Sequence, residues 1–540
     1  MSTASFLPAA ARTRRWSNVR RFPAWLVATA SDPRAGLWLV IGFAAAHAVL
    51  WTLILVNLKA AQDVHMDVAE AFAWGQKFQF GYGKHPPLSG WVAGLWFTVF
   101  PVANWATYAL AMATLGCGLV VCWLIALRVV DRRRAFFVVV MLALYPIFNF
   151  KGFKYNPDLL QLVTLPLLVL AYLDAFEKRS ARSGLWLGLA GALALMTKYW
   201  VLTMIGAIGL AALLHPDRLR FLRSPAPWVA IATLAALMLP HLVWLREVDF
   251  VPLTYAGDVY GVSDRSENIQ RVFGYVGHNF ALLALPVALA ALALAISPHW
   301  RRWLRQPSAW LARSWSRGRN GGVNLSQARN IWIIQAIVAV GPPLGGLLFN
   351  MYMKTDWGIS LFFLTPLALV AIPALRMQKM ALFHLAAIWL VTTLIVLAAS
   401  PYIAAHEMAV NPNAAPTFGA RSELARELTQ AWRTRFHSRW AVVAGTTEMG
   451  EPLTFYSPDH PAPLTPGEVW SSGLTSLEEA KRLGFIGVCD TTDGRLPICE
   501  AWMAANAANA ERLTITTQRF FKGHPGPAIT WKVFIAPPAQ

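Results

Sequence analysis

Long runs of apolar residues separated by short charged loops dominate the chain from residue 37 to residue 400. A membrane-spanning helix needs about 20 apolar residues, or fewer where neighbouring helices shelter it. The pattern therefore predicts an α-helical polytopic membrane protein with about 11 spans. The predicted spans are 37–58, 105–130, 136–150, 159–176, 184–197, 200–214, 228–245, 280–296, 331–349, 359–375 and 382–399.

Arginine and lysine cluster in alternate loops, and this asymmetry predicts the orientation of the spans. The N-terminal segment 1–36, the triplet 132–134 and the loop 301–329 are strongly basic. Short basic loops stay in the cytoplasm. The loops 59–104, 151–158, 198–199, 246–278 and 354–357 are then expected on the outer, periplasmic side. Residues 88–102 are apolar but span only about 22 Å as a helix, so we expect a juxtamembrane helix there.

Composition agrees with a membrane protein and limits the function. Hydrophobic residues make up 56% of the 540 residues and charged residues 14%, whereas soluble domains have about a quarter charged residues. The net charge of +19 could indicate a nucleic-acid partner. Because the basic residues lie in short loops between spans, the charge instead indicates orientation. The first apolar run is too long for a cleaved signal peptide.

From residue 401 onward the composition becomes that of a soluble domain, and span parity places it outside the membrane. Helical and strand patterns alternate there, which predicts a small periplasmic α/β domain over residues 401–540. The expected helices are 421–436, 476–483 and 498–510, and the expected strands are 440–445, 485–489, 513–520 and 529–535. Cys489 and Cys499 flank a turn and could pair in an oxidising compartment; two free thiols are the open alternative.

The outer loops carry polar residues that a bilayer would reject, at the ends of spans. Ionisable groups at such positions are functional candidates. The candidates are Asp67, Tyr82, Lys84, His85, Asp158, Lys198, Tyr199, Lys354 and Trp357. Structural alternatives stay open: Asp158 could cap a helix, and Lys198 and Lys354 could extend to the lipid head groups. The first loop could also be an ordinary solvated connection.

The stretch Asp67–Trp91, DVAEAFAWGQKFQFGYGKHPPLSGW, resembles the first outer loop of bacterial glycosyltransferases that use polyprenyl-phosphate sugars. These GT-C membrane enzymes include the aminoarabinose transferase of lipid A and relatives of the protein O-mannosyltransferases. Matching positions are Asp67, Gln76, Gly81, Tyr82 and His85-Pro86-Pro87, whereas Val68 replaces the family's second acid. The motifs YNPD (155–158), TKY (197–199) and KTDW (354–357) are similar to other family motifs.

The resemblance implies sugar transfer from a polyprenyl-phosphate donor, with Asp67 and Asp158 as the catalytic acids. Asp67 would take the proton of an acceptor hydroxyl, and direct displacement would invert the anomeric carbon. Lys84, His85, Lys198 and Lys354 would stabilise the departing phosphate. The acceptor could be lipid A, core glycan, another lipid or a protein. No cofactor is implied; the spacing Asp63-x-His65-x-Asp67 lacks a fourth metal ligand, and a divalent metal stays open.

A membrane transporter or flippase for a lipid-linked or anionic substrate is the main alternative function, because transporters also gather charged residues in membrane cavities. Transporters bind near the bilayer midplane and often contain repeated halves. Here the charged residues lie at one surface, and we find no internal repeat. A sensor with an outer ligand domain would leave those residues unexplained. We therefore expect a glycosyltransferase of the bacterial inner membrane with its site facing the periplasm.

Overall fold

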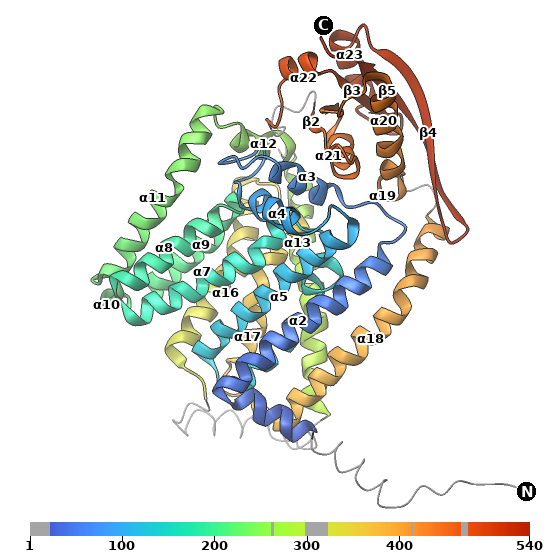
Figure 1. The fold of residues 1–540 in the computed structure, drawn as a ribbon. Helices are drawn as coiled ribbons and strands as arrows, with labels where there is room; N and C mark the ends of the chain where they lie inside the picture. The colour runs from blue at the N-terminus through green and yellow to red at the C-terminus, as the bar shows by residue number, and fades with distance from the viewer. Residues whose placement is uncertain (1–21, 261–263, 297–321, 412–414, 466–472, 540) are drawn as a thin grey trace, which may run out of the picture.

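A bundle of long helices carries a smaller α/β domain at one end (Figure 1). The computed structural model describes residues 22–260, 264–296, 322–411, 415–465 and 473–539. Seven of the described helices are long and apolar enough to cross a membrane: α2 (Pro33–Leu58), α5 (Asn104–Val129), α7 (Pro157–Lys178), α11 (Pro225–Glu247), α13 (Arg265–Ala295), α16 (Leu325–Phe349) and α18 (Lys379–Val410). The predicted helical membrane fold with a small C-terminal domain is confirmed.

The predicted number of spans is not confirmed, because four predicted spans correspond to bent or short segments. Helix α6 (Arg132–Ala143) and the segment Pro146–Phe153 meet at an angle of 79° and count as one span only if taken together. Proline at position 146 removes an N–H and starts the bend. Three further predicted spans are short apolar helices, Ala181–Leu195, Tyr199–Leu214 and Thr355–Val370. Length and composition among the described residues therefore support seven spans, or eight with the bent pair.

The remaining elements connect these helices or cover their ends. They are α3 (Met66–Gly75), α4 (Leu88–Val99), η1 (Pro146–Phe148), η2 (Phe150–Phe153), α8 (Ala181–Leu195), η3 (Tyr199–Val201), α9 (Leu202–Leu214), α10 (Arg218–Leu222), α12 (Val251–Tyr260), η4 (Thr355–Leu364), α17 (Thr365–Val370) and α19 (Ala415–Phe418). The basic segments 1–21 and 297–321, on which part of the orientation argument depends, lie outside the described residues.

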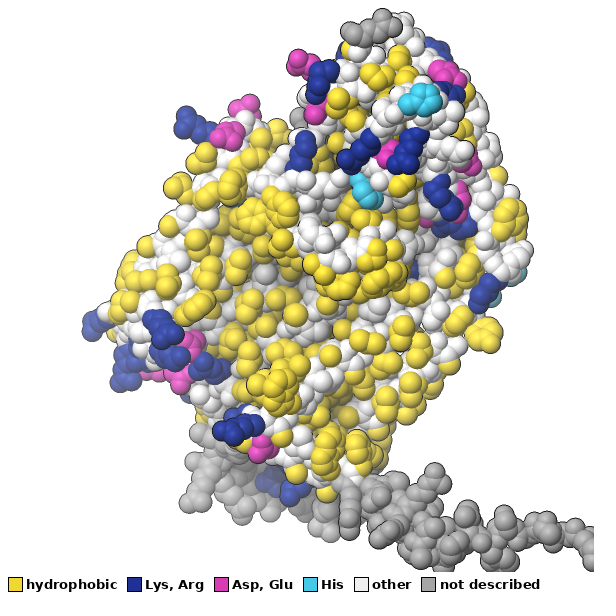
Figure 2. Space-filling model, viewed as in Figure 1, with side chains coloured by type: hydrophobic (Ala, Val, Ile, Leu, Met, Phe, Trp, Pro, Cys, Tyr) yellow, Lys and Arg dark blue, Asp and Glu magenta, His cyan; other side chains and the backbone are white. Residues whose placement is uncertain are grey.

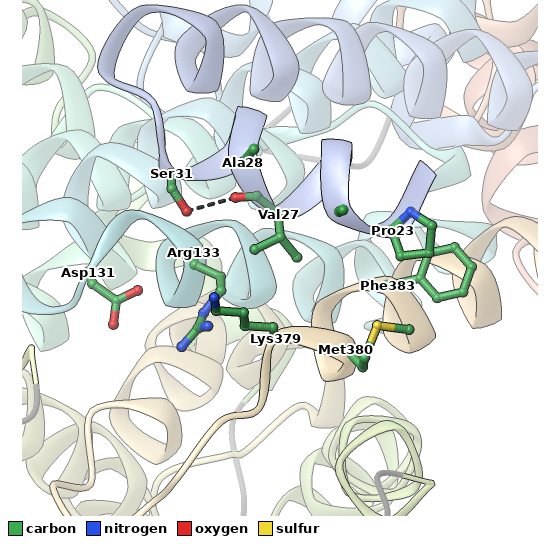
Figure 3. A pocket seen from close by; sticks show the side chains of 10 residues that line it. Pro23, Val27, Ala28, Ser31, Asp131, Arg133, Lys379, Met380 and Phe383 are labelled. Carbon is green, nitrogen blue, oxygen red and sulfur yellow. Dashed lines mark hydrogen bonds between the residues drawn. The ribbon is translucent and has the colours of Figure 1, made fainter. Parts of the chain in front are cut away.

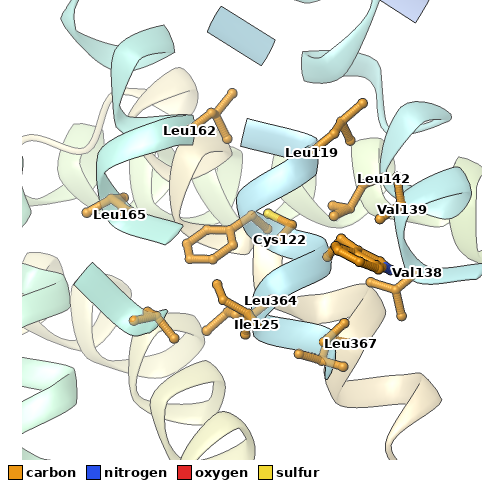
Figure 4. Packing of buried hydrophobic residues seen from close by; sticks show 14 of the residues in the cluster. Leu119, Cys122, Ile125, Val138, Val139, Leu142, Leu162, Leu165, Leu364 and Leu367 are labelled. Atoms are coloured by element: carbon orange, nitrogen blue, oxygen red, sulfur yellow. The ribbon is translucent and has the colours of Figure 1, made fainter. Parts of the chain in front are cut away.

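Apolar side chains both fill the bundle and cover its flank. Figure 2 shows a hydrophobic surface between two ends where charged side chains gather. Inside, α5, α6 and α7 interlock through residues such as Leu119, Val139 and Leu162 (Figure 4). Lipid offers helices no hydrophobic drive to associate, so this close packing is what holds the bundle together.

The first outer loop folds into two short helices that lie over the end of the bundle. Helix α3 begins at His65, whose Nδ1 accepts a hydrogen bond from the Asp67 backbone N–H (3.2 Å). Helix α4 runs along α3, and a Cβ at Gly75 would lie 2.5 Å from the Gly94 nitrogen. These glycines therefore permit the close approach of the two backbones. The predicted juxtamembrane helix at 88–102 corresponds to α4.

The C-terminal domain is a five-stranded mixed sheet with strand order β2-β1-β3-β5-β4. Its elements are β1 (Val442–Ala444), β2 (Ala462–Leu464), β3 (Phe485–Asp490), β4 (Glu511–Phe521), β5 (His524–Ala536), α20 (Arg421–Phe436), α21 (Thr447–Tyr456), α22 (Leu477–Leu483) and α23 (Leu496–Asn506). Cys489 on β3 and Cys499 on α23 form a disulfide, which decides between the two alternatives left open by the sequence.

A buried ion-pair network fastens this domain to the first outer loop. Asp63, whose side chain is 7% exposed, pairs with Arg519 of β4 (2.5 Å) and accepts the backbone N–H of Arg421 (2.9 Å). Arg519 also pairs with Glu423 (2.9 Å). Above this network, the Tyr456 hydroxyl accepts the Val64 N–H (2.7 Å). The domain is therefore docked on the same loop that carries α3.

Replacing Arg519 with methionine should weaken this docking strongly, because the buried Asp63 carboxylate and the partly buried Glu423 carboxylate would lose their cation. Breaking a buried pair from one side costs about 3–5 kcal/mol. We expect much faster limited proteolysis of the C-terminal domain in the purified protein. Arg435→Met is the matched control, because the Arg435–Glu511 pair is largely exposed and exposed pairs contribute at most about 1 kcal/mol. Equal proteolysis of both variants would contradict the role given to Arg519.

Candidate active site

A cavity of about 670 Å³ opens where α3 and the bundle meet, on the side of the C-terminal domain. Eight of the nine residues predicted from the sequence line it: Asp67, Lys84, His85, Asp158, Lys198, Tyr199, Lys354 and Trp357. They come from the first outer loop and from the starts of α7, η3 and η4. The expected convergence of the outer loops above one cavity is thus what the structure shows.

Tyr82 is the exception, since it does not line the cavity. Its ring is fully buried and stacks on Trp74, with the ring centres 5.0 Å apart. Its hydroxyl lies within hydrogen-bond distance of the Trp74 and Lys77 carbonyl oxygens (2.8 and 2.7 Å). Tyr82 therefore holds the turn after α3 in place, and it contacts no substrate space directly.

Asp67 faces the cavity from the first turn of α3 and is held by two partners. The Asn156 amide donates to its Oδ2 (2.9 Å), and the Lys154 ammonium lies 3.6 Å from the same oxygen. Burial alone would raise the pKa of Asp67, but His65, Lys154 and the Asn156 amide outweigh it and lower the pKa. Asp67 is therefore ionised at neutral pH and can accept a proton.

Asp158 and Lys198 form a two-pronged ion pair on the wall of the cavity. The Lys198 ammonium lies 2.7 and 2.8 Å from the two Asp158 carboxylate oxygens and 5.5 Å from the centre of the Trp357 ring. The residue that caps α7 is Asn156, whose side chain accepts the Leu159 N–H (2.9 Å). Asp158 is thus not the helix cap, and its charge is directed at Lys198.

Asn156 therefore connects the two acids. Its side-chain oxygen fixes the start of α7, on which Asp158 lies, while its amide nitrogen donates to Asp67. Pro157 follows at the first helical position, where a missing N–H does no harm. The sequence motif that suggested a second acidic position thus also contains the residue that orients the first.

Lys84 is paired with Glu70 at the other side of the cavity. The ammonium lies 2.5 Å from Glu70 Oε1, and both side chains are about one-tenth exposed. Burial would lower the pKa of Lys84, but the carboxylates of Glu70 and Glu451 outweigh burial and raise it. Glu451 belongs to α21 of the C-terminal domain and is 1% exposed. Lys84 is consequently a fixed cation, and the C-terminal domain contributes to its electrostatic surroundings.

His85 does not supply a cation at neutral pH. Burial, together with Lys198 and Lys84, lowers its pKa well below the ordinary value. Its ring meets Trp74 and Tyr255 edge-on, with ring centres 6.0 and 6.3 Å apart. A neutral imidazole can still donate or accept one hydrogen bond in the cavity. The lysines remain the cations available to an anionic ligand.

A second, smaller chamber of about 180 Å³ adjoins the first at Asp67. Asp67, Asn156, Asp158, Lys354 and Trp357 line both spaces. The small chamber adds Lys151, Lys154, Asp356 and Ser360. Asp67 therefore stands at the boundary between a large cavity and a small polar chamber, where two ligands could meet at one carboxylate.

Sequence reasoning missed Glu70, Lys154, Asn156 and Tyr255 as lining or supporting residues. Glu70 follows Asp67 by three residues, so both lie on one helix face, and that spacing could have found it. Lys154 and Asn156 belong to the outer segment 151–158, of which only Asp158 was selected. Tyr255 on α12 carries no sequence signal, because its approach depends on the tertiary fold.

The spacing Asp63-x-His65-x-Asp67 does not assemble a ligand set. Asp63 is bonded to Arg519 and the backbone of α20, whereas Asp67 faces the cavity. Among the residues that the structure describes, no three His, Cys, Asp or Glu side chains are grouped as metal ligands.

Part of the chain matches a known family at the level of sequence. Residues 84–244 match the family described as dolichyl-phosphate-mannose-protein mannosyltransferase, which confirms the resemblance over that segment. The lipid A galacturonosyltransferase RgtD of Rhizobium johnstonii is 26% identical over 277 residues, or 49% of this chain and 54% of RgtD. The match thus spans about half the length of this curated relative.

Two solved structures resemble this chain in its backbone, with TM-scores below 0.5. One is the crystal structure of ArnT from Cupriavidus metallidurans bound to undecaprenyl phosphate, with a TM-score of 0.46 and 12% identity over 93% of this chain and 98% of ArnT. The other is the cryo-EM structure of the arabinofuranosyltransferase AftD from Mycobacteria, with a TM-score of 0.42 and 14% identity over 92% of this chain and 40% of AftD.

Proposed function

We propose that the protein is a membrane glycosyltransferase that moves a sugar from a polyprenyl-phosphate donor to an envelope acceptor. The observation that carries this proposal is the position of Asp67, ionised and oriented by Asn156, where it lines two adjoining chambers that lysine side chains also line. The sequence match of residues 84–244 to a family of lipid-phosphate-sugar-dependent transferases supports it.

The reaction requires one proton transfer and one displacement. An acceptor hydroxyl attacks the anomeric carbon while its proton passes to an oxygen of Asp67. The bond between that carbon and the phosphate oxygen breaks, and the electron pair leaves with the polyprenyl phosphate. Attack opposite to the leaving group inverts the anomeric configuration. The donor brings its own leaving group, so the mechanism needs no nucleotide.

Lys84, Lys198 and Lys354 stabilise the charge that grows on the departing phosphate. Lys84 and Lys198 are held in position by Glu70 and Asp158, which reduces the reorganisation needed when the donor binds. His85 and Tyr199 add neutral polar contacts to the cavity. Trp357 lies against the Lys198 ammonium and limits its motion.

We propose a lipid acceptor at the periplasmic face of the inner membrane, with lipid A as the first candidate. RgtD is named as a lipid A transferase, and the cavity lies at the end of the bundle where a lipid head group can reach it. The same relative makes a uronic acid the first sugar to test. Lysines at 151 and 154 in the small chamber would balance a sugar carboxylate.

Mass spectrometry of envelope lipids, with and without the gene, tests the proposed function. We expect one lipid species to lose the mass of one sugar in the deletion strain and to regain it with the wild-type gene. Accumulation of the intact polyprenyl-phosphate sugar would accompany the loss. An unchanged lipid and glycan profile, with movement of an intact lipid-linked substrate across vesicles, would mark a flippase instead.

The proposed orientation can be tested with single cysteines at exposed described positions. In a background lacking Cys117 and Cys122, Glu427→Cys on α20 should react with a membrane-impermeant thiol reagent in spheroplasts. Arg220→Cys, in the basic loop at the opposite end, should react only after lysis. The Cys489–Cys499 disulfide supports this orientation, because disulfides persist in oxidising compartments. Labelling of Arg220→Cys from outside would reverse the topology.

The pH dependence of transfer should lack an acid limb in the accessible range. Asp67 must be ionised to act as the base, and its lowered pKa keeps it ionised down to a pH below the ordinary carboxyl range. Lys84 has a raised pKa and stays charged on the alkaline side. We expect kcat/KM to be flat from about pH 5 to pH 8, well above the ordinary Asp pKa of about 3.9. A fall centred near pH 6 would assign the base to a histidine.

A further inference from the structure

The end of the bundle opposite the candidate active site carries a wide pocket that the proposed reaction does not use. It has a volume of about 910 Å³ and lies between the short helix Phe22–Ser31 and the first turns of α6 and α18 (Figure 3). Val27 and Ala28 of the short helix and Met380 and Phe383 of α18 line the pocket, and these side chains form an apolar wall.

Two cations lie together at this wall. Arg133 and Lys379 extend toward each other in Figure 3, from the first turns of α6 and α18. Arg133 donates one hydrogen bond to the Met377 carbonyl (3.2 Å), and its buried Nε has no hydrogen-bond partner among the described residues. The two helix N-termini add partial positive charge at the same place.

The one acidic residue among the described lining residues, Asp131, already interacts with Arg134. Asp131 caps α6 by accepting the Arg134 N–H (3.0 Å), and its carboxylate lies 3.4 Å from the Arg134 Nε. Its charge is thus balanced by Arg134. The pocket presents a net positive charge beside an apolar surface. A ligand that satisfies both parts needs an anionic head and a hydrocarbon chain.

We propose that this pocket binds an anionic phospholipid from the adjoining membrane leaflet. The lipid phosphate lies between Arg133 and Lys379, and one acyl chain follows the wall formed by Val27 and Phe383. Basic pockets between spans on the cytoplasmic side bind anionic head groups. The neighbouring Phe22 and Trp25 are about half exposed and stack on each other (5.5 Å), as expected of rings at a membrane–water boundary.

Native mass spectrometry of the full-length protein, released from vesicles of phosphatidylglycerol and phosphatidylcholine, tests this proposal. We expect the wild type to retain phosphatidylglycerol, and Arg133→Gln/Lys379→Gln to retain roughly 30-fold less, the effect of two basic residues near an anionic lipid. Arg218→Gln/Arg220→Gln is the matched control, because it removes two exposed cations of α10 that line no part of this pocket. That control should retain phosphatidylglycerol like the wild type.

A second variant separates a lipid from a free anion. Val27→Trp leaves both cations in place but fills the apolar wall, so it should also reduce phosphatidylglycerol retention. Equal retention of the two lipids by the wild type, or full retention by the Arg133/Lys379 variant, would overturn the proposal. Undiminished retention in Val27→Trp, or complete displacement by inorganic phosphate, would show that the acyl chain is not bound there.

Discussion

Asp67→Asn is expected to reduce sugar transfer by about 10²–10⁴-fold, the effect of losing a general base. Asparagine keeps the shape of the side chain and can still accept the Asn156 amide, but it cannot take a proton. Donor binding should persist, because removing a negative charge near a phosphate does not weaken that contact. Initial rates in reconstituted vesicles and binding of labelled donor, measured on the same preparation, test both parts.

Two other acids separate the base from a general acidic patch. The Asp63→Asn variant should keep a much higher rate of sugar transfer per folded molecule than Asp67→Asn, because Asp63 contacts Arg519 and the docked domain instead of the cavity. It should, however, loosen the domain toward protease. Asp158→Asn should impair transfer through Lys198, its ion-pair partner. Near wild-type transfer by Asp67→Asn together with an inactive Asp158→Asn would mean that the base has been assigned to the wrong carboxylate.

Lys84→Met is expected to reduce transfer by about 10²–10³-fold, as for a lost donor to a developing oxyanion. The single variant also removes the cation that pairs with the buried Glu70 carboxylate at 2.5 Å. The double variant Glu70→Gln/Lys84→Met removes both charges and distinguishes the two effects. If Lys84 stabilises the phosphate, the double variant stays as impaired as the single one.

Recovery of transfer in that double variant would show that Lys84 serves only to neutralise Glu70. Lys151→Met is the matched control, because Lys151 lines the small chamber and its nearest carboxylate, Asp356, lies 3.8 Å away and partly exposed. Its substitution removes the cation of no buried acid, because Asp356 is 40% exposed. We expect a much smaller loss of transfer for it than for Lys84→Met, unless the transferred sugar carries a carboxylate.

The apolar pattern predicted the long helices well, because a run of about 20 apolar residues has few structures open to it in a membrane. Its span assignments are not confirmed where length was ambiguous, as in α8 and α9, which are 15 and 13 residues long. Helix α18 extends beyond the predicted span 382–399, to Val410. The helix continues through Pro401, and the Ser400 hydroxyl donates to the Leu397 carbonyl (2.9 Å) that the proline leaves without an N–H.

The sequence predicted most residues of the candidate site, because ionisable residues at the ends of predicted spans converge on one cavity. The elements that hold it were less predictable, because their burial comes from contacts distant in sequence. Helix α21 contains Gly450 and Pro452, which indicate a turn in sequence, yet its Phe455 packs edge-on against Phe72 of α3 (5.4 Å). The carboxylate of Glu451, in the same helix, helps to raise the pKa of Lys84. No local pattern connects residue 451 with residue 84.

Helix α3 is consequently enclosed between the bundle and the C-terminal domain. Asp67 and Glu70 face the cavity, while Phe72 contacts Phe455 and His460 of the domain. This arrangement packs α3, the helix that carries Asp67, against the domain. Glu451→Gln should therefore raise KM for the donor through Lys84 while leaving the domain docked. Unaltered kinetics with an intact domain would restrict its role to docking.

A single-turnover assay with a donor of defined anomeric configuration tests the proposed reaction most directly. Purified protein in vesicles would receive a polyprenyl-phosphate sugar and a lipid A acceptor, and both products would be quantified by mass spectrometry and NMR. The mechanism predicts one polyprenyl phosphate released for each sugar transferred, a product of inverted configuration, and loss of both products in Asp67→Asn. Retained configuration, or transfer by Asp67→Asn at the wild-type rate, would contradict it.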